Sequence, residues 1–265
     1  MAPATTDYDV LLDLVRTRMS VRRLKPDPIP EDAVDRILET ARWAMSGANS
    51  QPWEFIVVRD PAVKRQLYDA YVTINAEYIF WVEQQRVPEL RHPSFQQPGA
   101  PEEQLRRLRE RYGKGWSVAP ALIVVLGDGR KQWGTVAGAH TFGRFMSHLT
   151  DGLANTSQLI HLAAASLGLG AQWVSIHVQE PFKRILDVPD LLMLYLIIPI
   201  GYPDVERRPG VRHEVKELVH YDRYDRSRYL TDAEAFDYLQ QLRGQTIAKY
   251  ATSYGQKPGE EGAGR

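Results

Sequence analysis

The sequence predicts an α+β protein, because helical and strand patterns both occur and a buried helix leads into a buried strand. Between residues 153 and 167, apolar side chains cover well over half of a helical surface, which is typical of a helix buried on several sides. Asp151 is expected in its first turn, where the helix dipole favours negative charge. Gly168 and Gly170 predict a left-handed cap and a tight turn. The apolar run from Ala171 indicates a buried strand, and we expect the rest of the chain to wrap this core unit.

The composition is that of a globular protein and excludes several classes of function. The chain has 265 residues, of which 43% are hydrophobic and 25% are charged. Lys and Arg together number 33, as do Asp and Glu, so the electrostatic basis for binding nucleic acid is missing. Cysteine is absent, which excludes disulfides, thiolate nucleophiles and metal sites built on cysteine. Its absence also fits the cytoplasmic location that we expect.

Neither a secretory signal nor a membrane-spanning helix is expected. The first ten residues, MAPATTDYDV, lack a charged region followed by an apolar one. The longest apolar run covers residues 191–200, about half of the roughly 20 residues that a spanning helix needs, and Pro199 interrupts it. We therefore expect no membrane partner.

Apolar spacing predicts the other elements in chain order. Helices are expected at residues 9–19, 31–44, 61–81 and 181–186. The first two present apolar faces formed by Val10, Leu11, Leu14 and Val15, and by Val34, Ile37, Leu38 and Ala41. Strands are expected at residues 54–58, 120–127, 194–202 and 217–221. Thr231 and Glu234 have the spacing of a capping box, which predicts a last amphipathic helix to about residue 250. Pro52 is expected to hold Gln51 in an extended conformation.

The histidines do not predict a metal site. Residues 127–147 are glycine-rich and indicate a loop that carries His140, with His148 just beyond it and His161 and His177 further along. No pair of these has a spacing like that of the HExxH motif, and an isolated histidine is more often a packed or surface residue. We therefore expect no metal ion.

Four arginines occur within residues 16–23, at the end of the first predicted helix. They could form a solvated face that complements the negative end of the helix dipole. They could also form an anion site, since a guanidinium group binds phosphate through paired N–H donors. The pattern Arg18-Met19-Ser20-Val21-Arg22 resembles the FMN signature Arg-x-Ser-x-Arg/Lys of the nitroreductase superfamily. That resemblance implies that Arg18 grips the FMN phosphate, and that Arg22 reaches the phosphate or the pyrimidine edge of the flavin.

A second motif follows the second predicted helix. Residues 44–53, AMSGANSQPW, resemble the family motif Ala-Pro-Ser-x-x-Asn-x-Gln-Pro-Trp, with Met45 in place of the usual proline. In the family this loop reaches the flavin that is bound mainly by the partner subunit. The resemblance therefore implies a homodimer in which each site needs both chains. The implied loop contacts are Met45, Ser46, Gly47, Asn49 and Gln51.

Two further stretches extend the resemblance over residues 9–224. The core unit resembles the family's central helix, which forms much of the dimer interface, and the strand that passes beside the flavin ring, here Trp173, Val174 and Ser175. Residues 198–203, IPIGYP, match a strand ending of the family. Val219, His220 and Tyr224 match a motif preceded by a basic pair that completes the phosphate site. Counting back from this motif places the pair at Arg212 and His213, of which Arg212 is preferred, with Arg208 in reserve.

The resemblance implies a nitroreductase-like, three-layer α-β-α sandwich with a central mixed, mostly antiparallel sheet, in an intertwined homodimer. We expect a single domain over residues 1–254, in which residues 75–117 form a variable cap insertion over the flavin pocket and residues 222–250 a C-terminal extension. Residues 255–265 are expected to be disordered. The cap region and its neighbours offer these candidates for an aromatic substrate wall: Tyr71, Tyr78, Phe80, Trp81, Phe95, Tyr112 and Trp116.

The implied chemistry is that of the flavin, and no side chain is assigned a catalytic role. Nucleophile motifs and dinucleotide-binding glycine patterns are missing from the sequence. The resemblance implies a ping-pong cycle, in which NAD(P)H reduces FMN and a nitroaromatic, quinone or similar small conjugated acceptor is then reduced. Two alternatives stay open. One is the same fold with reductive dehalogenation, dehydrogenation or flavin fragmentation, and the other is a non-catalytic flavin-binding protein. The sequence neither names the acceptor nor chooses between NADH and NADPH.

Overall fold

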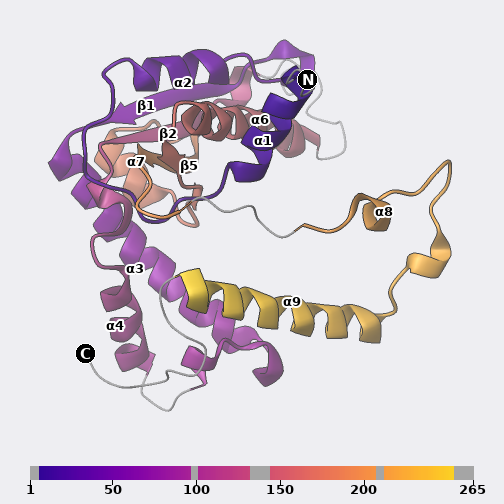
Figure 1. The fold of residues 1–265 in the computed structure, drawn as a ribbon. Helices are drawn as coiled ribbons and strands as arrows, with labels where there is room; N and C mark the ends of the chain where they lie inside the picture. Colours follow the sequence, from indigo (N-terminus) through magenta and orange to yellow (C-terminus); the bar gives the residue numbers. More distant parts are fainter. Residues whose placement is uncertain (1–5, 97–100, 132–143, 207–211, 254–265) are drawn as a thin grey trace. The chain divides into compact units, whose positions relative to one another are not determined.

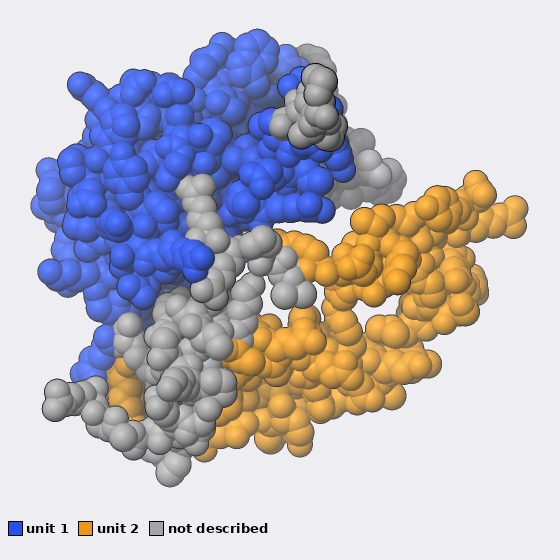
Figure 2. All heavy atoms as spheres, viewed as in Figure 1, with its two compact units in different colours: residues 1–75, 109–211 blue, residues 76–108, 212–265 orange. Residues whose placement is uncertain are grey.

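The computed structural model describes residues 6–96, 101–131, 144–206 and 212–253. The chain divides into two compact units, and each is described by itself (Figure 2). Unit 1 consists of residues 1–75 and 109–211, and unit 2 of residues 76–108 and 212–265. The described helices and strands, labelled as in Figure 1, are α1 Asp7–Thr17, α2 Ala33–Ala41, β1 Trp53–Val58, α3 Pro61–Gln85, α4 Pro101–Tyr112, β2 Ala121–Gly127, α6 Arg144–Ser166, β3 Gly170–Ala171, β4 Val174–Ser175, α7 Glu180–Leu186, β5 Met193–Gly201, α8 Val215–Leu218 and α9 Asp232–Ser253.

An antiparallel sheet forms the middle of unit 1. Its strands follow the order β1-β2-β5-β3, and β4 also pairs with β5. The named pairs are all antiparallel, with Ile123 of β2 opposite Ile198 of β5. An isolated parallel bridge joins Ser20 to Ala171. Every residue of β2 is buried, which explains why this strand reads as a continuous apolar run.

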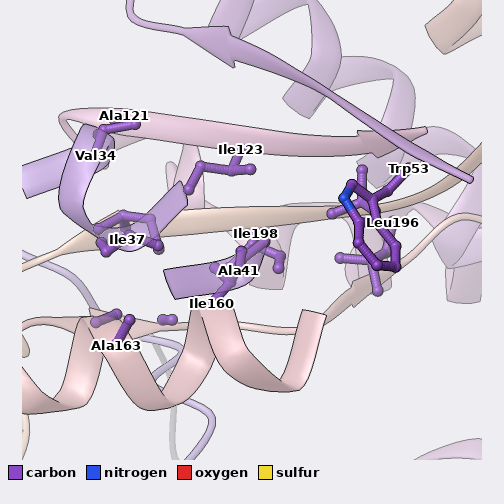
Figure 3. Packing of buried hydrophobic residues seen from close by; sticks show 14 of the residues in the cluster. Val34, Ile37, Ala41, Trp53, Ala121, Ile123, Ile160, Ala163, Leu196 and Ile198 are labelled. Carbon is purple, nitrogen blue, oxygen red and sulfur yellow. The ribbon is translucent and has the colours of Figure 1, made fainter. Parts of the chain in front are cut away.

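Two hydrophobic clusters cover the two faces of the sheet. Successive side chains of a strand point to opposite faces, so Ile123 and Val125 join one cluster and Leu122 and Val124 join the other. The first cluster includes α2 and α6. Figure 3 shows its members Ile37, Ala41, Ile123, Ile160, Ala163 and Ile198 gathered between helix and strands. The second cluster includes Leu67 and Tyr68 of α3 and Phe182 of α7. Unit 1 is therefore a three-layer α-β-α sandwich, and the predicted α+β class is confirmed.

The central helix α6 is longer than predicted. It begins at Arg144, so Asp151 lies in its third turn, beyond the first turn in which the helix dipole acts. The predicted loop over residues 127–147 is therefore wrong for residues 144–147, while residues 132–143 lie outside the described part of the chain. The helix ends as predicted, at Gly168 with φ of +77°. Hydrogen bonds from Leu169 N to Ala164 O (2.8 Å) and from Gly168 N to Ala165 O (3.1 Å) complete a Schellman cap.

The strand predicted from Ala171 is broken into two short pieces, β3 and β4, which both pair with β5. The break at Gln172 and Trp173 lies opposite Pro199 and Ile198, as the register of the two pairs requires. Proline has no N–H group, so Pro199 cannot donate the ladder hydrogen bond that would continue the strand. The backbone N–H of Gln172 still donates to Pro199 O, at 3.3 Å. Trp173 thus lies outside regular pairing, with its side chain partly exposed.

Unit 2 differs from the prediction at one element and agrees at another. The strand predicted at residues 217–221 is wrong, because residues 215–218 form the short helix α8. A strand needs a hydrogen-bonded neighbour, and the strand pairs in the described part of the chain belong to the sheet of unit 1. The predicted capping box is confirmed at the start of α9, since Thr231 N donates to Glu234 Oε2 at 2.8 Å. The proposed single-domain organisation stays a prediction.

A buried carboxylate links the elements of unit 2. Glu83 of α3 accepts a hydrogen bond of 2.8 Å from His92 N and pairs with Arg243 of α9. Across residues 6–96, 101–131, 144–206 and 212–253, no helix combines the length and apolar character required to cross a membrane.

Candidate functional site

The arginine motif lies against the edge of the sheet, next to β3. Val21 N donates a hydrogen bond of 2.9 Å to Ala171 O, and Ser20 bridges to the same residue. Further along, Lys25 N donates to Tyr202 O at 2.8 Å. These contacts place Arg18-Met19-Ser20 beside the start of the strand that carries Trp173. Two motifs about 150 residues apart in sequence therefore meet in unit 1.

Gly170 permits this close approach. A Cβ atom at this position would lie 3.0 Å from both Cβ and Cγ2 of Val21, and 3.1 Å from Cδ2 of Leu24. Such distances are shorter than ordinary van der Waals contacts, so a larger residue would push the arginine segment away from β3. Met19 packs onto the second hydrophobic cluster, while Arg22 is exposed and Arg18 is half-buried.

A pocket of about 320 Å³ opens beside this junction. Trp173 and Ser175, two of the three predicted strand contacts, line it, while Val174 points away into the second hydrophobic cluster. Tyr195 also lines the pocket and meets Trp173 edge to face, with 5.8 Å between ring centroids. Burial and the nearby Asp151 carboxylate raise the pKa of Tyr195. The full lining consists of Thr150, Trp173, Ser175, Ile176, Gln179, Met193, Leu194 and Tyr195.

His161 of α6 lies against the same junction, and the sequence did not identify it as a site residue. Its side chain is 2% exposed and stacks on Trp173, with 6.0 Å between centroids and an angle of 18° between the ring planes. Among the described residues, neither ring nitrogen has a hydrogen-bond partner. Burial, and secondarily the charge of Arg18, lower its pKa to about 4. The available signal was a polar ring inside the apolar run of α6, between Ile160 and Leu162.

The predicted flavin loop packs on the middle of α6, N-terminal to His161. Asn155 Nδ2 donates a hydrogen bond of 3.1 Å to Met45 O, and a Cβ atom on Gly152 would lie 3.4 Å from Ser46 Cβ. Residues Gly47–Asn49 form a 3₁₀ turn, and Met45 is 78% exposed. The loop is thus fixed to the helix while part of it faces outward.

This loop holds strained backbone. Ala48, Asn49 and Gln51 have φ values of 52°, 51° and 46°, which only glycine adopts readily. The expectation of an extended Gln51 before Pro52 is therefore wrong. The reason is a hydrogen bond of 3.0 Å from Gln51 N to Ser46 Oγ, which closes the loop. Strain of this kind is often kept where a site requires a particular shape.

One chain does not bring the two halves of the predicted site together. The loop contacts Gly152 and Asn155, whereas the arginine motif and Trp173 lie near His161. The nine-residue step from Gly152 to His161 corresponds to a rise of about 14 Å along an α-helix. Arg212 belongs to unit 2, and Arg208 lies outside the described residues, so their place in the site stays a prediction.

The candidate aromatic wall is largely accounted for by packing. In unit 1, Trp116 is buried and meets Tyr68 edge to face, at 4.9 Å between centroids, and Tyr71 and Tyr112 pack beside them. In unit 2, Phe80 is buried between Trp81 and Phe95. Within the described ranges, no group of three or more His, Asp or Glu side chains is arranged to hold a metal ion.

Known proteins resemble this chain over most of its length. The profile of the Nitroreductase family matches residues 15–202. A 5,6-dimethylbenzimidazole synthase of Rhodospirillum rubrum is 30% identical over 79% of this chain and 87% of its own length. An NADH dehydrogenase of Thermus thermophilus is 26% identical over 76% of this chain and 91% of its own. The solved structure of an iodotyrosine deiodinase bound to FMN and 3-iodo-L-tyrosine has a TM-score of 0.57 at 23% identity, covering 81% of this chain and all of that chain.

Proposed function

The chain belongs to the nitroreductase family, and on this basis we propose that it is an FMN-dependent oxidoreductase. Its proposed reaction is hydride transfer from NAD(P)H, through FMN, to a nitroaromatic, quinone or similar small conjugated acceptor. One observation carries the proposal: the hydrogen bond between Val21 and Ala171 joins the arginine motif to the strand and pocket that carry Trp173 and Ser175.

The donors present fit a phosphorylated flavin. Arg18 and Arg22 supply guanidinium groups and Ser20 supplies a hydroxyl, which together suit a phosphate group. The buried nitrogens of His161 and the indole of Trp173 lie at the same junction. Since the chain lacks a dinucleotide-binding glycine pattern, this donor set favours a mononucleotide, FMN, over FAD.

When bound, FMN would supply the hydride-transfer chemistry. The task of this chain's residues would be to bind and orient it. Arg18 and Ser20 would hold the phosphate, and the backbone from Trp173 to Ser175 would lie along the ring near the hydride-accepting atom. Arg22 would place a cation at the pyrimidine edge, where negative charge develops on reduction. None of these tasks needs an acid–base side chain, so no catalytic residue is proposed.

The hydride donor and the acceptor are the finer parts of the proposal. The name of the Thermus relative, an NADH dehydrogenase, supports NADH as the donor, and NADPH stays an alternative. The names of the relatives differ in chemistry, from dehydrogenase to deiodinase to 5,6-dimethylbenzimidazole synthase. Their range keeps dehalogenation, dehydrogenation and flavin fragmentation as alternatives on the same fold. The pocket between Trp173 and Tyr195 combines aromatic and apolar side chains with the polar Thr150, Ser175 and Gln179, which suits a flat conjugated molecule with polar substituents.

We further propose that the site is completed by a homodimer. The loop contacts the middle of α6 and the arginine motif lies nearer its C-terminal end, so one chain keeps the two halves of the predicted site apart. Two-fold pairing along this helix would bring each loop to its partner's arginine motif. Apolar side chains that are exposed in the single chain support the pairing. No residue of α1 is buried, and its Tyr8, Leu11 and Val15 are exposed.

The decisive experiment identifies the bound cofactor and then measures turnover. The purified protein is expected to be yellow, and flavin released by acid should migrate as FMN in chromatography. Anaerobic mixing with NADH or NADPH should bleach it, and a screen of nitroaromatics, quinones and iodotyrosine should restore the colour with the true acceptor. A protein that stays colourless after soaking in FMN contradicts the proposal. A yellow protein that neither NADH nor NADPH bleaches supports a non-catalytic flavin-binding protein instead.

A further inference from the structure

The imidazole of His161 is a feature of unit 1 that the proposed function leaves unexplained. It is almost completely buried, and among the described residues neither of its nitrogens has a hydrogen-bond partner. Buried polar groups are nearly always paired, because losing water without gaining a partner destabilises the fold. An apolar residue at this position of α6 would avoid that cost. The missing partner is therefore expected to come from outside the described residues.

The neighbours of His161 indicate where that partner binds. One face of the ring stacks on Trp173, which lines the pocket. The guanidinium of Arg18 lies close enough for its charge to disfavour the protonated form of the ring. Trp173 belongs to the proposed flavin strand and Arg18 to the proposed phosphate site. His161 thus lies where the phosphate end of FMN would meet the rest of the cofactor.

We propose that His161 is a cofactor-binding residue, in which one ring N–H donates a hydrogen bond to the FMN phosphate beside Arg18. This inference rests on the proposed function, since it needs FMN as the ligand. A phosphate held by Arg18 would bring acceptor oxygens to an imidazole whose nitrogens have no hydrogen-bond partner among the described residues. Because the nitrogens are shielded from water in the protein alone, the imidazole or the Arg18 side chain turns when the phosphate binds.

Electrostatics favour the phosphate over the uncharged ring as the partner. In the protein alone, burial and Arg18 lower the pKa of His161. A phosphate with about two negative charges would oppose the effect of Arg18 and strengthen a hydrogen bond from the imidazole. The flavin ring carries no comparable charge, and the face of His161 toward Trp173 is already covered by stacking.

Apolar variants of His161 distinguish phosphate binding from simple packing, because the two roles predict different affinities for FMN. His161→Leu removes the buried nitrogens, and His161→Phe removes them while keeping an aromatic ring against Trp173. If His161 only fills space, either variant binds FMN as the wild type does. If it binds the phosphate, both variants lose FMN affinity although the apoprotein gains stability. His161→Gln keeps an N–H donor and should recover part of the affinity.

The experiment compares FMN with riboflavin, which lacks the phosphate. Flavin is removed from the full-length protein, the apoprotein fold is checked by circular dichroism and its melting temperature, and both ligands are titrated by flavin fluorescence. We expect the dissociation constant for FMN to rise about ten- to a hundredfold in His161→Leu and His161→Phe, the loss of one charge-assisted hydrogen bond. The dissociation constant for riboflavin should stay within about twofold of the wild-type value.

An unchanged FMN constant in a folded apolar variant overturns the inference, and so does an equal loss of affinity for FMN and riboflavin, which indicates contact with the ring instead. If one apolar variant fails to fold, the other decides. A wild-type protein that binds no FMN overturns the proposed function itself, which distinguishes that failure from failure of the role of His161.

Discussion

The backbone N–H of Val21 donates a hydrogen bond of 2.9 Å to the carbonyl oxygen of Ala171, and this contact organises the candidate site. It fixes the segment after α1 against β3, which places Arg18 near the strand that carries Trp173 and close enough for its charge to act on His161. A backbone contact fixes position without depending on the side chains at either residue. Substitutions on either side of this contact therefore test the site.

Arg18→Ala should weaken FMN binding by about ten- to a hundredfold, because a charge-assisted phosphate contact contributes roughly 1.5–3 kcal/mol. The matched control is Arg23→Ala, since Arg23 is exposed and pairs with Asp204 at 2.9 Å. An exposed ion pair contributes at most about 1 kcal/mol, so the control should bind FMN nearly as the wild type does. Fluorescence titration of the apoproteins gives both constants. Equal affinities for the two variants would move the phosphate site away from Arg18.

Gly170→Ala should reduce both stability and FMN affinity, because the added methyl group would lie 3.0 Å from Val21 and displace the arginine segment. Overpacking of this kind costs about 1–3 kcal/mol. Gly168→Ala is the control. Its positive φ makes alanine unfavourable by about 1–2 kcal/mol, but nothing lies within 4 Å of the new atom. Denaturant unfolding should show similar losses of stability, with loss of FMN affinity in Gly170→Ala alone. If both variants keep FMN equally well, the close approach at Gly170 has no role in the site.

Local patterns predicted most elements of unit 1, and the misses have non-local causes. The helix with Val34, Ile37 and Ala41 inward and the continuous apolar strand β2 follow from side-chain periodicity within a short stretch. The break between β3 and β4 depends on Pro199, a residue of a different strand. The strand predicted at residues 217–221 lacks a partner strand within the described residues of its unit. Periodicity carries no information about either relationship.

The site was predictable where a motif exists and unpredictable where only packing reveals a residue. The motifs indicated Arg18, Ser20 and the loop from Met45 to Gln51, although their roles stay predictions. His161 belongs to no motif. Its assignment to the candidate site depends on stacking with Trp173 and on the charge of Arg18, which is 143 positions earlier in the chain. Such a relationship exists only after folding.

His161 should also make the apoprotein less stable in mild acid. Its pKa is about 4 in the folded chain, against an ordinary value of 6.5. Because its folded pKa is the lower one, protonation favours the unfolded chain as the pH falls below about 6.5, and the penalty becomes constant below about 4. Between pH 7 and pH 5 this amounts to about 2 kcal/mol. Urea unfolding of wild type and His161→Leu at both pH values measures it, and an equal loss in the two proteins would contradict a neutral buried imidazole.

Leu159 on α6 packs only partly onto the core of its own chain, and the Met45–Gln51 loop lies on the same helix. If two chains pair along α6, Leu159→Asp places a charge in the interface and should separate the dimer. It should then also release FMN, although Leu159 lies on no motif of the site, because each flavin would lose the loop supplied by the other chain.

Leu191→Asp is the control for the added charge, since Leu191 is 75% exposed and lies in the turn before β5. It should leave both the dimer and the flavin in place. Sedimentation and flavin absorbance recorded on the same sample link the two properties, and circular dichroism checks that the variant is folded. A folded Leu159→Asp monomer with full FMN occupancy would show that one chain completes the site. Joint loss of dimer and flavin in Leu159→Asp, with both retained in the apolar variant Leu159→Met, would instead tie cofactor binding to assembly.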